Sequence, residues 1–281
     1  MKKIGIIGFG NMGSAMAERM AKISYGFRKI GVLVFDKDTQ KAEAAKGIEV
    51  AKGINDLVER ADTVILAVKP QDIDSVLMEI KNGERPALII SVAAGITTAH
   101  IETILGHGEV IRGMPNLPAK IGKGMTGLCK SKFASEGNLD WSKDLFYSLG
   151  QVVIVKEEMM DAITAVSGSG PAYVCYFLQK ESFDPRRISW RAKRQFLREF
   201  LNAAERLNFN RGDAALLVNM TFSGTIDFLK KTKTHPADLI KQVASKGGTT
   251  EAGLEVLQKG GTLNEAVQAA KNRAEELSKK E

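Results

Sequence analysis

The chain has 281 residues, a formal net charge of +7 at pH 7, and a composition that is 44% hydrophobic and 26% charged. This length is enough for two modest domains that each bury a core, and the composition is ordinary for a globular protein. No apolar run reaches the roughly 18 residues that cross a bilayer, and the N-terminus lacks the apolar region and cleavage site of a signal peptide. We therefore expect a cytoplasmic protein that does not bind a membrane.

Short apolar strands alternate with helical patterns in the first half of the chain. Helical spacing of apolar residues over Asn11 to Ile23 follows the first of these strands. Such alternation indicates βαβ units and a parallel sheet. The expected strands are Ile4 to Ile7, Ile30 to Phe35, Thr63 to Val68, Ala87 to Val92, Val110 to Arg112 and Val152 to Val155.

After Glu157 the pattern changes, and we expect only helices. An α/β half followed by an all-α half predicts an N-terminal Rossmann-like doubly wound sheet and a C-terminal all-α domain, with the boundary near residues 156–161. The expected helices are Asp161 to Ala165, Ala172 to Gln179, Arg191 to Leu207, Arg211 to Lys231, Pro236 to Ala244 and Leu263 to Ser278.

A glycine-rich turn follows the first strand and opens the first helix. It reads Gly8-Phe9-Gly10-Asn11-Met12-Gly13, which is the pattern GxGxxG. The first glycine permits a tight turn, the second lets the backbone approach a pyrophosphate, and the third allows close packing of helix and strand. The N-terminus of the helix also favours a phosphate. The context predicts a dinucleotide site rather than a plain glycine turn.

The end of the second strand carries Asp36 and Lys37. An acidic side chain here can hydrogen-bond a ribose diol, which favours NADH, whereas the 2′-phosphate of NADPH prefers a cation. Asp36 therefore favours NADH, while Lys37 weakly favours NADPH. The alternative is that both are solvated turn residues.

Three further strand ends carry unusual segments, and ligands of doubly wound sheets bind at such ends. Two later loops are rich in glycine and hydroxyl groups. The strand ends are Ala67-Val68-Lys69-Pro70-Gln71, Val92-Ala93-Ala94-Gly95-Ile96 and Met114-Pro115-Asn116-Leu117-Pro118, and the loops are Ser167-Gly168-Ser169-Gly170-Pro171-Ala172-Tyr173 and Ser245-Lys246-Gly247-Gly248-Thr249-Thr250.

In the order and wording of these segments, the chain resembles the pyrroline-5-carboxylate reductase family over nearly its whole length. The resemblance implies reduction of a cyclic imine to L-proline with NADPH or NADH. It implies that residues 1–158 form a dinucleotide-binding Rossmann domain and that residues 159–281 form a helical dimerisation and substrate domain. It also implies a site at a dimer interface and dimers that assemble further, commonly into decamers.

The loop before Thr250 fits the carboxylate of such a substrate. Gly247 and Gly248 free backbone N–H groups to converge, and a helix beginning near Thr250 would favour an anion. We assign Ser245, Gly247, Gly248 and Thr249 to the carboxylate. By resemblance, the catalytic Thr250 places its hydroxyl at the imine nitrogen. The alternative from the residues alone is a capped turn with threonine as N-cap.

The family's cofactor contacts extend beyond the glycine turn and the Asp36-Lys37 pair. By resemblance we add Asn55, Ala67, Val68, Lys69, Pro70, Ala93, Ala94, Gly95 and Asn116. Asn55 could instead be the N-cap of a helix over Asp56 to Arg60. The glycines and serines of Ser167 to Gly170 are expected to permit close helix packing rather than to touch substrate.

The chain departs from the family pattern at residues 180–199, which we interpret as a surface insertion. This segment contains seven Lys or Arg and three Asp or Glu, so it holds +4 of the net charge of +7. The charge is therefore local, which argues against a nucleic-acid surface. A basic docking patch is the alternative. Lys233, Gln242 and Lys246 also differ from the residues usual in the family.

Neither cysteine nor histidine predicts a metal site. Cys129 and Cys175 lie far apart, and the three histidines lack the spacing of metal ligands. We expect two buried, reduced thiols. Two other functions, a β-hydroxyacid dehydrogenase and a dinucleotide sensor, fit the sequence less well. A β-hydroxyacid dehydrogenase would need a lysine that residues 162–179 do not contain, and in a non-catalytic dinucleotide sensor the Gly247 to Thr250 loop would have decayed.

Overall fold

The computed structural model describes residues 2–25, 28–43, 47–81, 88–106, 108–181 and 189–279. Contacts divide the chain into two compact units. Unit 1 comprises Met1–Met114 and Leu128–Glu157 together with Glu281, and unit 2 comprises Pro115–Gly127 and Glu158–Lys280. The segment 115–127 thus packs with the helical half, although the chain returns to unit 1 after it. The functions expected for residues 1–158 and 159–281 stay predictions.

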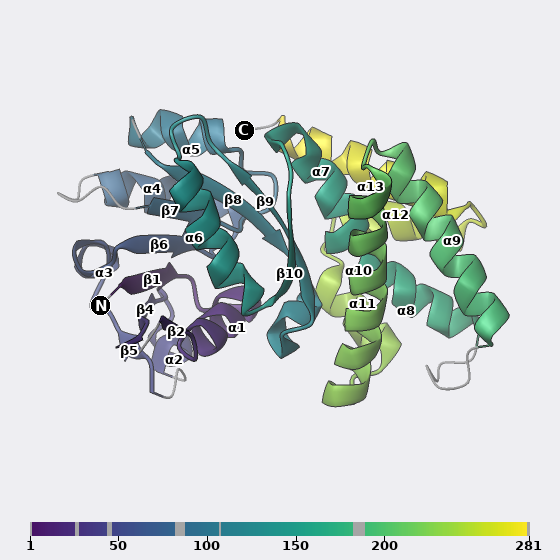
Figure 1. Cartoon of the computed structure of the whole chain (residues 1–281), viewed down its shortest axis with the longest axis horizontal. Helices are drawn as coiled ribbons and strands as arrows, with labels where there is room; N and C mark the ends of the chain where they lie inside the picture. The colour runs from purple at the N-terminus through teal and green to yellow at the C-terminus, as the bar shows by residue number, and fades with distance from the viewer. Residues whose placement is uncertain are drawn as a thin grey trace. The chain divides into compact units, whose positions relative to one another are not determined.

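An eight-stranded sheet contains every strand that the sequence predicts (Figure 1). Its spatial order is β10-β9-β8-β7-β6-β1-β4-β5, and the paired strands from β5 to β8 run parallel. The bounds are β1 (Lys3–Ile7), β4 (Gly31–Phe35), β5 (Glu49–Val50), β6 (Thr63–Leu66), β7 (Leu88–Ser91), β8 (Val110–Pro115), β9 (Gly124–Lys130) and β10 (Gly150–Ile154), with a separate antiparallel pair β2 (Ser24–Tyr25) and β3 (Arg28–Lys29).

The strand order reverses at β1. This strand pairs with β4 on one side and with β6 on the other, so that Ile4 lies between Val32 and Thr63. The chain first moves outwards through β4 and β5, and then returns to build β6, β7 and β8 on the opposite side. This is the order of a Rossmann fold, which binds ligands outside the strand ends at the reversal. The predicted doubly wound sheet is confirmed.

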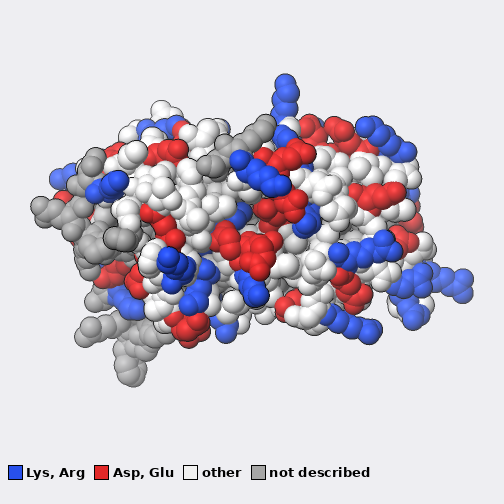
Figure 2. Space-filling model, turned by 90° about the horizontal axis from the view of Figure 1, so that it is seen from above, with Lys and Arg blue, Asp and Glu red and all other residues white. Residues whose placement is uncertain are grey.

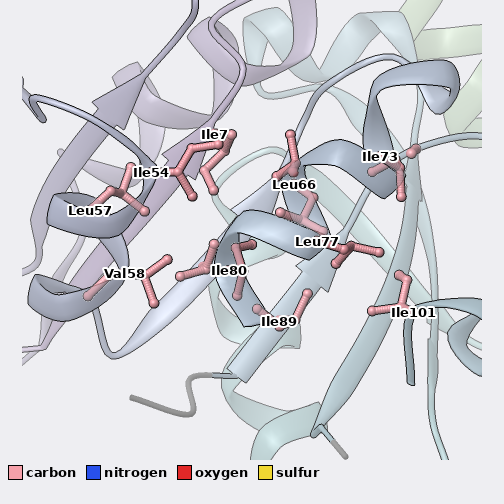
Figure 3. Packing of buried hydrophobic residues seen from close by; sticks show 14 of the residues in the cluster. Ile7, Ile54, Leu57, Val58, Leu66, Ile73, Leu77, Ile80, Ile89 and Ile101 are labelled. Carbon is pink, nitrogen blue, oxygen red and sulfur yellow. The ribbon is translucent and has the colours of Figure 1, made fainter. Parts of the chain in front are cut away.

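The helices of unit 1 bury apolar faces against the sheet. One cluster joins the helices α3 and α4 to strands β1, β6 and β7, and its close packing is visible in Figure 3. Leu57, Leu66 and Leu77 at its centre are fully buried. The helices are α1 (Asn11–Met20), α2 (Thr39–Glu43), α3 (Ile54–Arg60), α4 (Ile73–Lys81), α5 (Thr98–Leu105) and α6 (Glu136–Tyr147).

From Glu158 onwards, the described residues of unit 2 form helices, turns and loops and no strand. Helix α10 packs against both α8 and α9, and α12 packs along α13 (Figure 1). Aromatic rings fill the space between α8, α9 and α10, where Phe196 contacts Phe177, Phe200 and Phe222. The helices are α7 (Met160–Ile163), α8 (Gly170–Glu181), α9 (Trp190–Arg206), α10 (Arg211–Thr232), α11 (Pro236–Val243), α12 (Thr249–Gln258) and α13 (Leu263–Ser278).

Strand β9 and helix α6 were not predicted. Strand β9 contains Gly124 and Gly127, and glycine weakens a strand pattern. Gly127 is needed because a β-carbon there would lie 2.7 Å from the side chain of Ile163. Helix α6 begins with Glu136-Gly137-Asn138, which resembles a loop, but a capping box between Ser135 and Asn138 starts the helix.

The packing at Gly170 yields a stability prediction. In Gly170→Ala the new β-carbon would lie 2.5 Å from Thr221 Cγ2 and 3.1 Å from Phe200 Cζ. We expect the free energy of unfolding to fall by about 1–3 kcal/mol, because the core must shift to accept the methyl group. Gly137→Ala in α6 is the control, since its β-carbon would meet nothing closer than Ser135 Oγ at 3.7 Å. Urea denaturation at one protein concentration measures both changes, and equal effects would contradict the packing described.

Candidate functional site

The glycine turn after β1 has the geometry expected of a phosphate-binding loop. Gly8 has a φ of +97°, and a β-carbon there would lie 2.7 Å from the backbone of Ala67. A β-carbon on Gly13 would lie 1.9 Å from the carbonyl oxygen of Gly8. Both positions therefore require glycine for close packing. Gly10 differs, because a β-carbon there would have nothing within 4 Å, so its backbone is open to a ligand.

A cavity of about 420 Å³ lies at the ends of β1, β4 and β6. Its position is the one at which doubly wound sheets bind dinucleotides. Seven residues predicted from the sequence line it together: Gly8, Gly10, Asp36, Lys37, Ala67, Val68 and Lys69. The open backbone at Gly10 and the adjoining N-terminus of α1 fit a pyrophosphate.

Asp36 holds the glycine turn as well as lining the cavity. Its Oδ2 accepts a hydrogen bond of 2.6 Å from the backbone N–H of Phe9, and its Oδ1 accepts one of 2.9 Å from the N–H of Asp38. The carboxylate thereby connects the end of β4 to the turn after β1. A carboxylate has about four acceptor positions, so both oxygens can still accept from a ribose hydroxyl.

The lysines near Asp36 are paired with carboxylates. Lys37 Nζ lies 3.1 Å from Asp72 Oδ1, and Lys41 Nζ lies 3.0 Å from Asp38 Oδ2. The hydrogen bond with Lys41 lowers the pKa of Asp38, and the same contact raises the pKa of Lys41. These pairs are exposed and contribute little to stability, but they offset the positive charge that would attract a 2′-phosphate.

The remaining predicted cofactor residues have varied surroundings. Asn55 is the second residue of α3, whose N-cap is Gly53, so the alternative that Asn55 caps this helix is wrong. Asp56 accepts the N–H of Lys52 and stabilises the helix start. Pro70 opens a short 3₁₀ turn, Pro70–Asp72, and Ala93, Ala94 and Gly95 follow β7. Their contact with cofactor stays a prediction.

Asn116 belongs to unit 2 and is almost fully buried. Its Nδ2 donates to the carbonyl oxygen and the hydroxyl of Ser167 at 3.3 and 3.2 Å, and its Oδ1 accepts from the N–H of Met125 at 2.9 Å. These hydrogen bonds of Asn116 connect the segment after β8 to the turn before α8. Its expected contact with cofactor stays a prediction.

The loop 245–250 ends where α12 begins. Gly248 is the N-cap, with no side-chain capping bond, and Thr249 is the first helical residue. The alternative that a threonine caps this helix is therefore wrong. Gly247 has a φ of +70°, and a β-carbon on Gly248 would lie 2.3 Å from Ser245 Oγ. The tight turn points the N–H groups of the first helical turn towards the loop, which is favourable for a carboxylate.

Two charged side chains hold this loop in place. The N–H of Gly247 donates to Glu251 Oε2 at 2.6 Å, and Arg273 Nε donates to the carbonyl oxygen of Gly247 at 2.7 Å. Arg273 also pairs with Glu276 at 2.7 Å. The side chain of Lys246 is exposed, and the turn is held by the contacts of Gly247 with Glu251 and Arg273.

Thr250 contacts Ser169, which was not predicted to belong to the site. Thr250 is buried, and its Oγ1 donates to Ser169 Oγ at 3.0 Å. Ser169 is also buried, and its Oγ lies 3.1 Å from Thr249 Oγ1. A π-helical turn, Thr164–Gly168, precedes Ser169, and such turns are frequent at functional sites. The signal in the sequence was a polar serine between two glycines at the start of an apolar helix.

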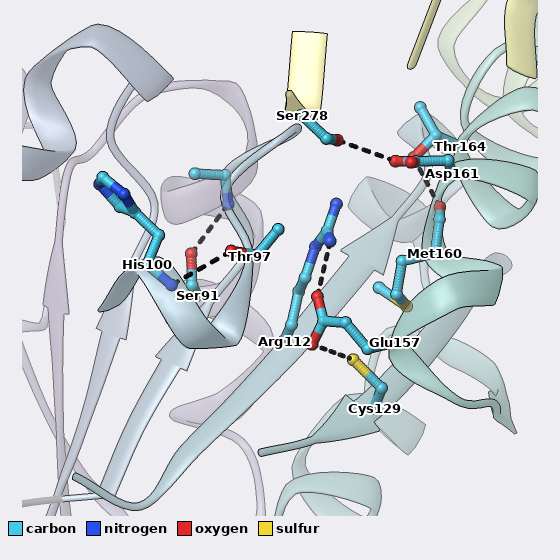
Figure 4. Close-up of polar contacts among 11 residues, drawn as sticks. Ser91, Thr97, His100, Arg112, Cys129, Glu157, Met160, Asp161, Thr164 and Ser278 are labelled. Atoms are coloured by element: carbon cyan, nitrogen blue, oxygen red, sulfur yellow. Dashed lines mark hydrogen bonds and ion pairs between the residues drawn. The ribbon is translucent and has the colours of Figure 1, made fainter. Parts of the chain in front are cut away.

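A polar cluster at the end of unit 1 joins the buried side chains of Arg112 and Cys129 to the half-buried carboxylate of Glu157 (Figure 4). Arg112 Nη1 pairs with Glu157 Oε1 at 2.8 Å, and the Cys129 thiol donates to Glu157 Oε2 at 3.3 Å. Burial and the adjacent carboxylate raise the pKa of Cys129, and burial raises the pKa of Cys175 to about 12. Both cysteines are free and buried, as predicted. Thiols held protonated in this way are poor nucleophiles.

The surface carries both signs of charge. On the face drawn in Figure 2, acidic and basic side chains are interspersed. Within the described ranges no helix is long and apolar enough to cross a membrane. The same residues contain no group of three or more His, Cys, Asp or Glu that could hold a metal ion.

Two family models match the chain. The model "Pyrroline-5-carboxylate reductase dimerisation" matches residues 157–181 and 194–277, and the model "NADP oxidoreductase coenzyme F420-dependent" matches residues 3–95. The first model leaves out residues 182–193, so the departure from the family is shorter than the predicted 180–199. Phe196 lies outside that gap and is buried. Residues 182–188 lie outside the described residues, whereas Trp190, at the start of α9, is exposed.

Similar proteins cover the whole chain. A pyrroline-5-carboxylate reductase of Synechocystis is 33% identical over 99% of this chain and 99% of its own, and one of Aquifex aeolicus is 31% identical over 98% and 97%. The structure of a pyrroline-5-carboxylate reductase from Coxiella burnetii has a TM-score of 0.63, with 31% identity and 98% of each chain covered. The Plasmodium falciparum enzyme, solved with NADP bound, has a TM-score of 0.61 with 26% identity, over 99% of this chain and 100% of its own.

These matches agree with the two sites in the structure. The region matched by the oxidoreductase model contains the glycine turn and Asp36, and the region matched by the dimerisation model contains Ser169 and Thr250. The chain belongs to the pyrroline-5-carboxylate reductase family.

Proposed function

We propose that this chain reduces 1-pyrroline-5-carboxylate to L-proline with NADH or NADPH, which is the last step of proline biosynthesis. The observation that carries the proposal is the conjunction of a dinucleotide cavity in unit 1 with a buried threonine at the start of a helix in unit 2. Family membership supplies the substrate. We expect the protein to form dimers, with decamers as a further assembly, and its cytoplasmic location stays a prediction.

The reaction requires few catalytic groups from the protein. The nicotinamide, when bound, supplies a hydride to the imine carbon, and the ring nitrogen takes up one proton if the imine binds neutral. The residues must then hold the ring, exclude water and keep the reacting atoms aligned, and alignment can supply much of the rate gain. We assign Gly8, Gly10 and Asp36 to the cofactor. A β-hydroxyacid dehydrogenase is less well supported, because residues 162–179 contain no lysine.

The substrate carboxylate is assigned to the start of α12. The N–H groups around Gly248 and Thr249 converge there, and the hydroxyl groups of Ser245 and Thr249 add donors. The positive end of the α12 dipole favours a negative charge by roughly 0.3–1 kcal/mol at an exposed site, and by more when the site is partly buried. We assign Thr250, the next residue, to the ring nitrogen. The reaction is tested by following oxidation of NADH or NADPH with pyrroline-5-carboxylate, and no oxidation above the rate without enzyme would contradict the proposal.

The cofactor prediction concerns Asp36. Its carboxylate should accept the ribose hydroxyls of NADH and repel the 2′-phosphate of NADPH, so kcat/KM for NADH should be at least as high as for NADPH. Asp36→Asn should raise kcat/KM for NADPH relative to NADH by about tenfold, equivalent to roughly 1.4 kcal/mol. Steady-state kinetics with each cofactor measures the ratio. Asp140→Asn removes the same charge from an exposed position in helix α6 that does not line the cavity, and it should leave the ratio nearly unchanged.

The wild-type enzyme alone can overturn this assignment. A preference for NADPH of about a hundredfold, equivalent to roughly 2.7 kcal/mol, would show that Lys37 or another cation recognises the 2′-phosphate. Asp36 would then serve only to hold the glycine turn through Phe9.

The catalytic prediction concerns Thr250. Thr250→Val keeps the shape of the side chain and removes the hydroxyl. If that hydroxyl stabilises the nitrogen more strongly in the transition state than in the bound substrate, kcat should fall while KM changes little. A fall of about a hundredfold is expected, since such a contact is worth roughly 2–4 kcal/mol. The measurement is steady-state kinetics, together with the Kd of NADH, which should not change.

Thr225→Val provides a matched control in the same unit. Thr225 is also buried in a helix, and its hydroxyl donates to the carbonyl oxygen of Thr221 at 2.7 Å. This variant should retain wild-type kcat. Near-wild-type turnover by Thr250→Val would refute the role assigned to its hydroxyl.

A further inference from the structure

We infer that Ser169 is a positioning residue that sets the direction in which the Thr250 hydroxyl donates, and that Tyr173 completes the hydroxyl chain behind it. The inference rests on the proposed function, because it takes imine reduction as the reaction. It goes further by adding two residues that neither bind the dinucleotide nor belong to the loop 245–250. It also concerns a hydrogen bond that points the wrong way for the chemistry.

Four hydroxyl-bearing residues at the starts of two helices meet in the interior of unit 2. Ser169 immediately precedes α8, and Tyr173 is the fourth residue of that helix. Thr249 and Thr250 are the first residues of α12. Ser169 Oγ lies 3.0 Å from Thr250 Oγ1 and 3.1 Å from Thr249 Oγ1. Ser169 and Tyr173 are both fully buried.

The phenol of Tyr173 is not explained by packing alone. Its hydroxyl is buried and makes no hydrogen bond of ordinary length within the described part of the chain, although Ser169 lies near enough to lower its pKa against the effect of burial. Burial of an unpaired hydroxyl is unfavourable, and native proteins keep few such groups. Helix α12 approaches it closely, because a β-carbon on Gly253 would lie only 2.4 Å from the phenol oxygen. The fold therefore keeps a polar group in an apolar interior beside Ser169.

Counting protons shows what this group can do. Each hydroxyl donates one hydrogen bond and can accept two. In the structure Thr250 donates to Ser169, so the Thr250 proton is directed away from any nitrogen bound on its other side. When Thr250 donates to a ring nitrogen instead, its oxygen can still accept, and Ser169 can turn its own proton towards Thr250 so that the two hydroxyls stay hydrogen-bonded. Ser169 then has a free acceptor position, which the Tyr173 hydroxyl can fill.

The reversed chain therefore runs from Tyr173 to Ser169, from Ser169 to Thr250, and from Thr250 to the ring nitrogen. No covalent bond changes in this reversal, since each hydroxyl only rotates about its own C–O bond. The hydroxyls of Tyr173, Ser169 and Thr250 then each donate one hydrogen bond to the next group, and the Tyr173 hydroxyl gains a partner. Burial raises the pKa of Tyr173, although Ser169 partly offsets the effect, so the phenol keeps its proton and remains a donor.

The backbone also supports a fixed position for Ser169. Its N–H donates to the carbonyl oxygen of Thr164 at 2.9 Å, which closes the wide π-helical turn. Gly170, the next residue, packs against Thr221 and Phe200. Since the turn and the packing both restrict Ser169, its hydroxyl can rotate but its Cβ cannot move away from α12.

A double-mutant cycle tests the inference. Ser169→Ala should lower kcat by about tenfold, the effect of about one hydrogen bond, with the KM values for imine and cofactor nearly unchanged. In the Thr250→Val background the same substitution should have no further effect on kcat, because the hydroxyl that Ser169 orients is absent. Single-turnover kinetics at saturating cofactor measures all four proteins. Ser142→Ala, another fully buried serine, should leave kcat unchanged.

Tyr173→Phe provides a second, milder test, since it removes only the phenol oxygen. We expect a two- to tenfold fall in kcat and no further fall when Ser169→Ala is added. The inference would be overturned if Ser169→Ala lowered kcat equally in the wild-type and Thr250→Val backgrounds. It would also be overturned if neither Ser169→Ala nor Tyr173→Phe changed kcat. Either result would leave the proposed function intact. Absence of imine reduction by the wild-type protein would overturn both.

Discussion

The reversal of strand order at β1 is the constraint on which the first site depends. Because β1 lies between β4 and β6, the turn after β1 must pass beside the end of β6, and only glycine can occupy position 8 there. The same turn leaves Gly10 open and places Asp36 under the backbone of Phe9. A backbone geometry imposed by the sheet thus creates the cavity, and the cavity then selects a dinucleotide rather than a compact ligand.

In unit 2, polar side chains are held in an apolar interior. Thr250 and Ser169 are buried and satisfy each other, while Glu251 and Arg273 fix the loop that precedes α12. These two side chains bond to the N–H and the carbonyl oxygen of Gly247 and so hold the loop in place. Rigid donors are what imine reduction needs, because the substrate is already electrophilic and its rate depends on alignment.

The sequence was sufficient to predict the parts that follow local rules. Alternating buried strands and the GxGxxG turn predicted the doubly wound sheet, and the helical periodicity predicted most of unit 2. Strand β9 was missed because Gly127 is set by the contact with Ile163, a requirement that lies far away in the chain. Threonine was considered as the N-cap of α12, but the helix begins one residue after Gly248.

The role of Ser169 could not be predicted for a similar reason. Its partners Thr249 and Thr250 follow about eighty residues later, and no local pattern joins them. Asp36 shows a different case, in which the residue was predicted to line the cavity but its hydrogen bonds from Phe9 and Asp38 were not foreseen. Its hydrogen bond to Phe9 depends on how the ends of β1 and β4 meet, which a strand pattern alone does not specify.

The central claim is that hydride passes from the nicotinamide to the imine carbon of a cyclic substrate. The most direct measurement uses NADH carrying deuterium at the transferred position of the nicotinamide ring, with pyrroline-5-carboxylate as substrate and NMR detection of the product. The account predicts proline with one deuterium at C5, the former imine carbon, on one face of the ring. Proline without deuterium, or deuterium at another carbon, would contradict it.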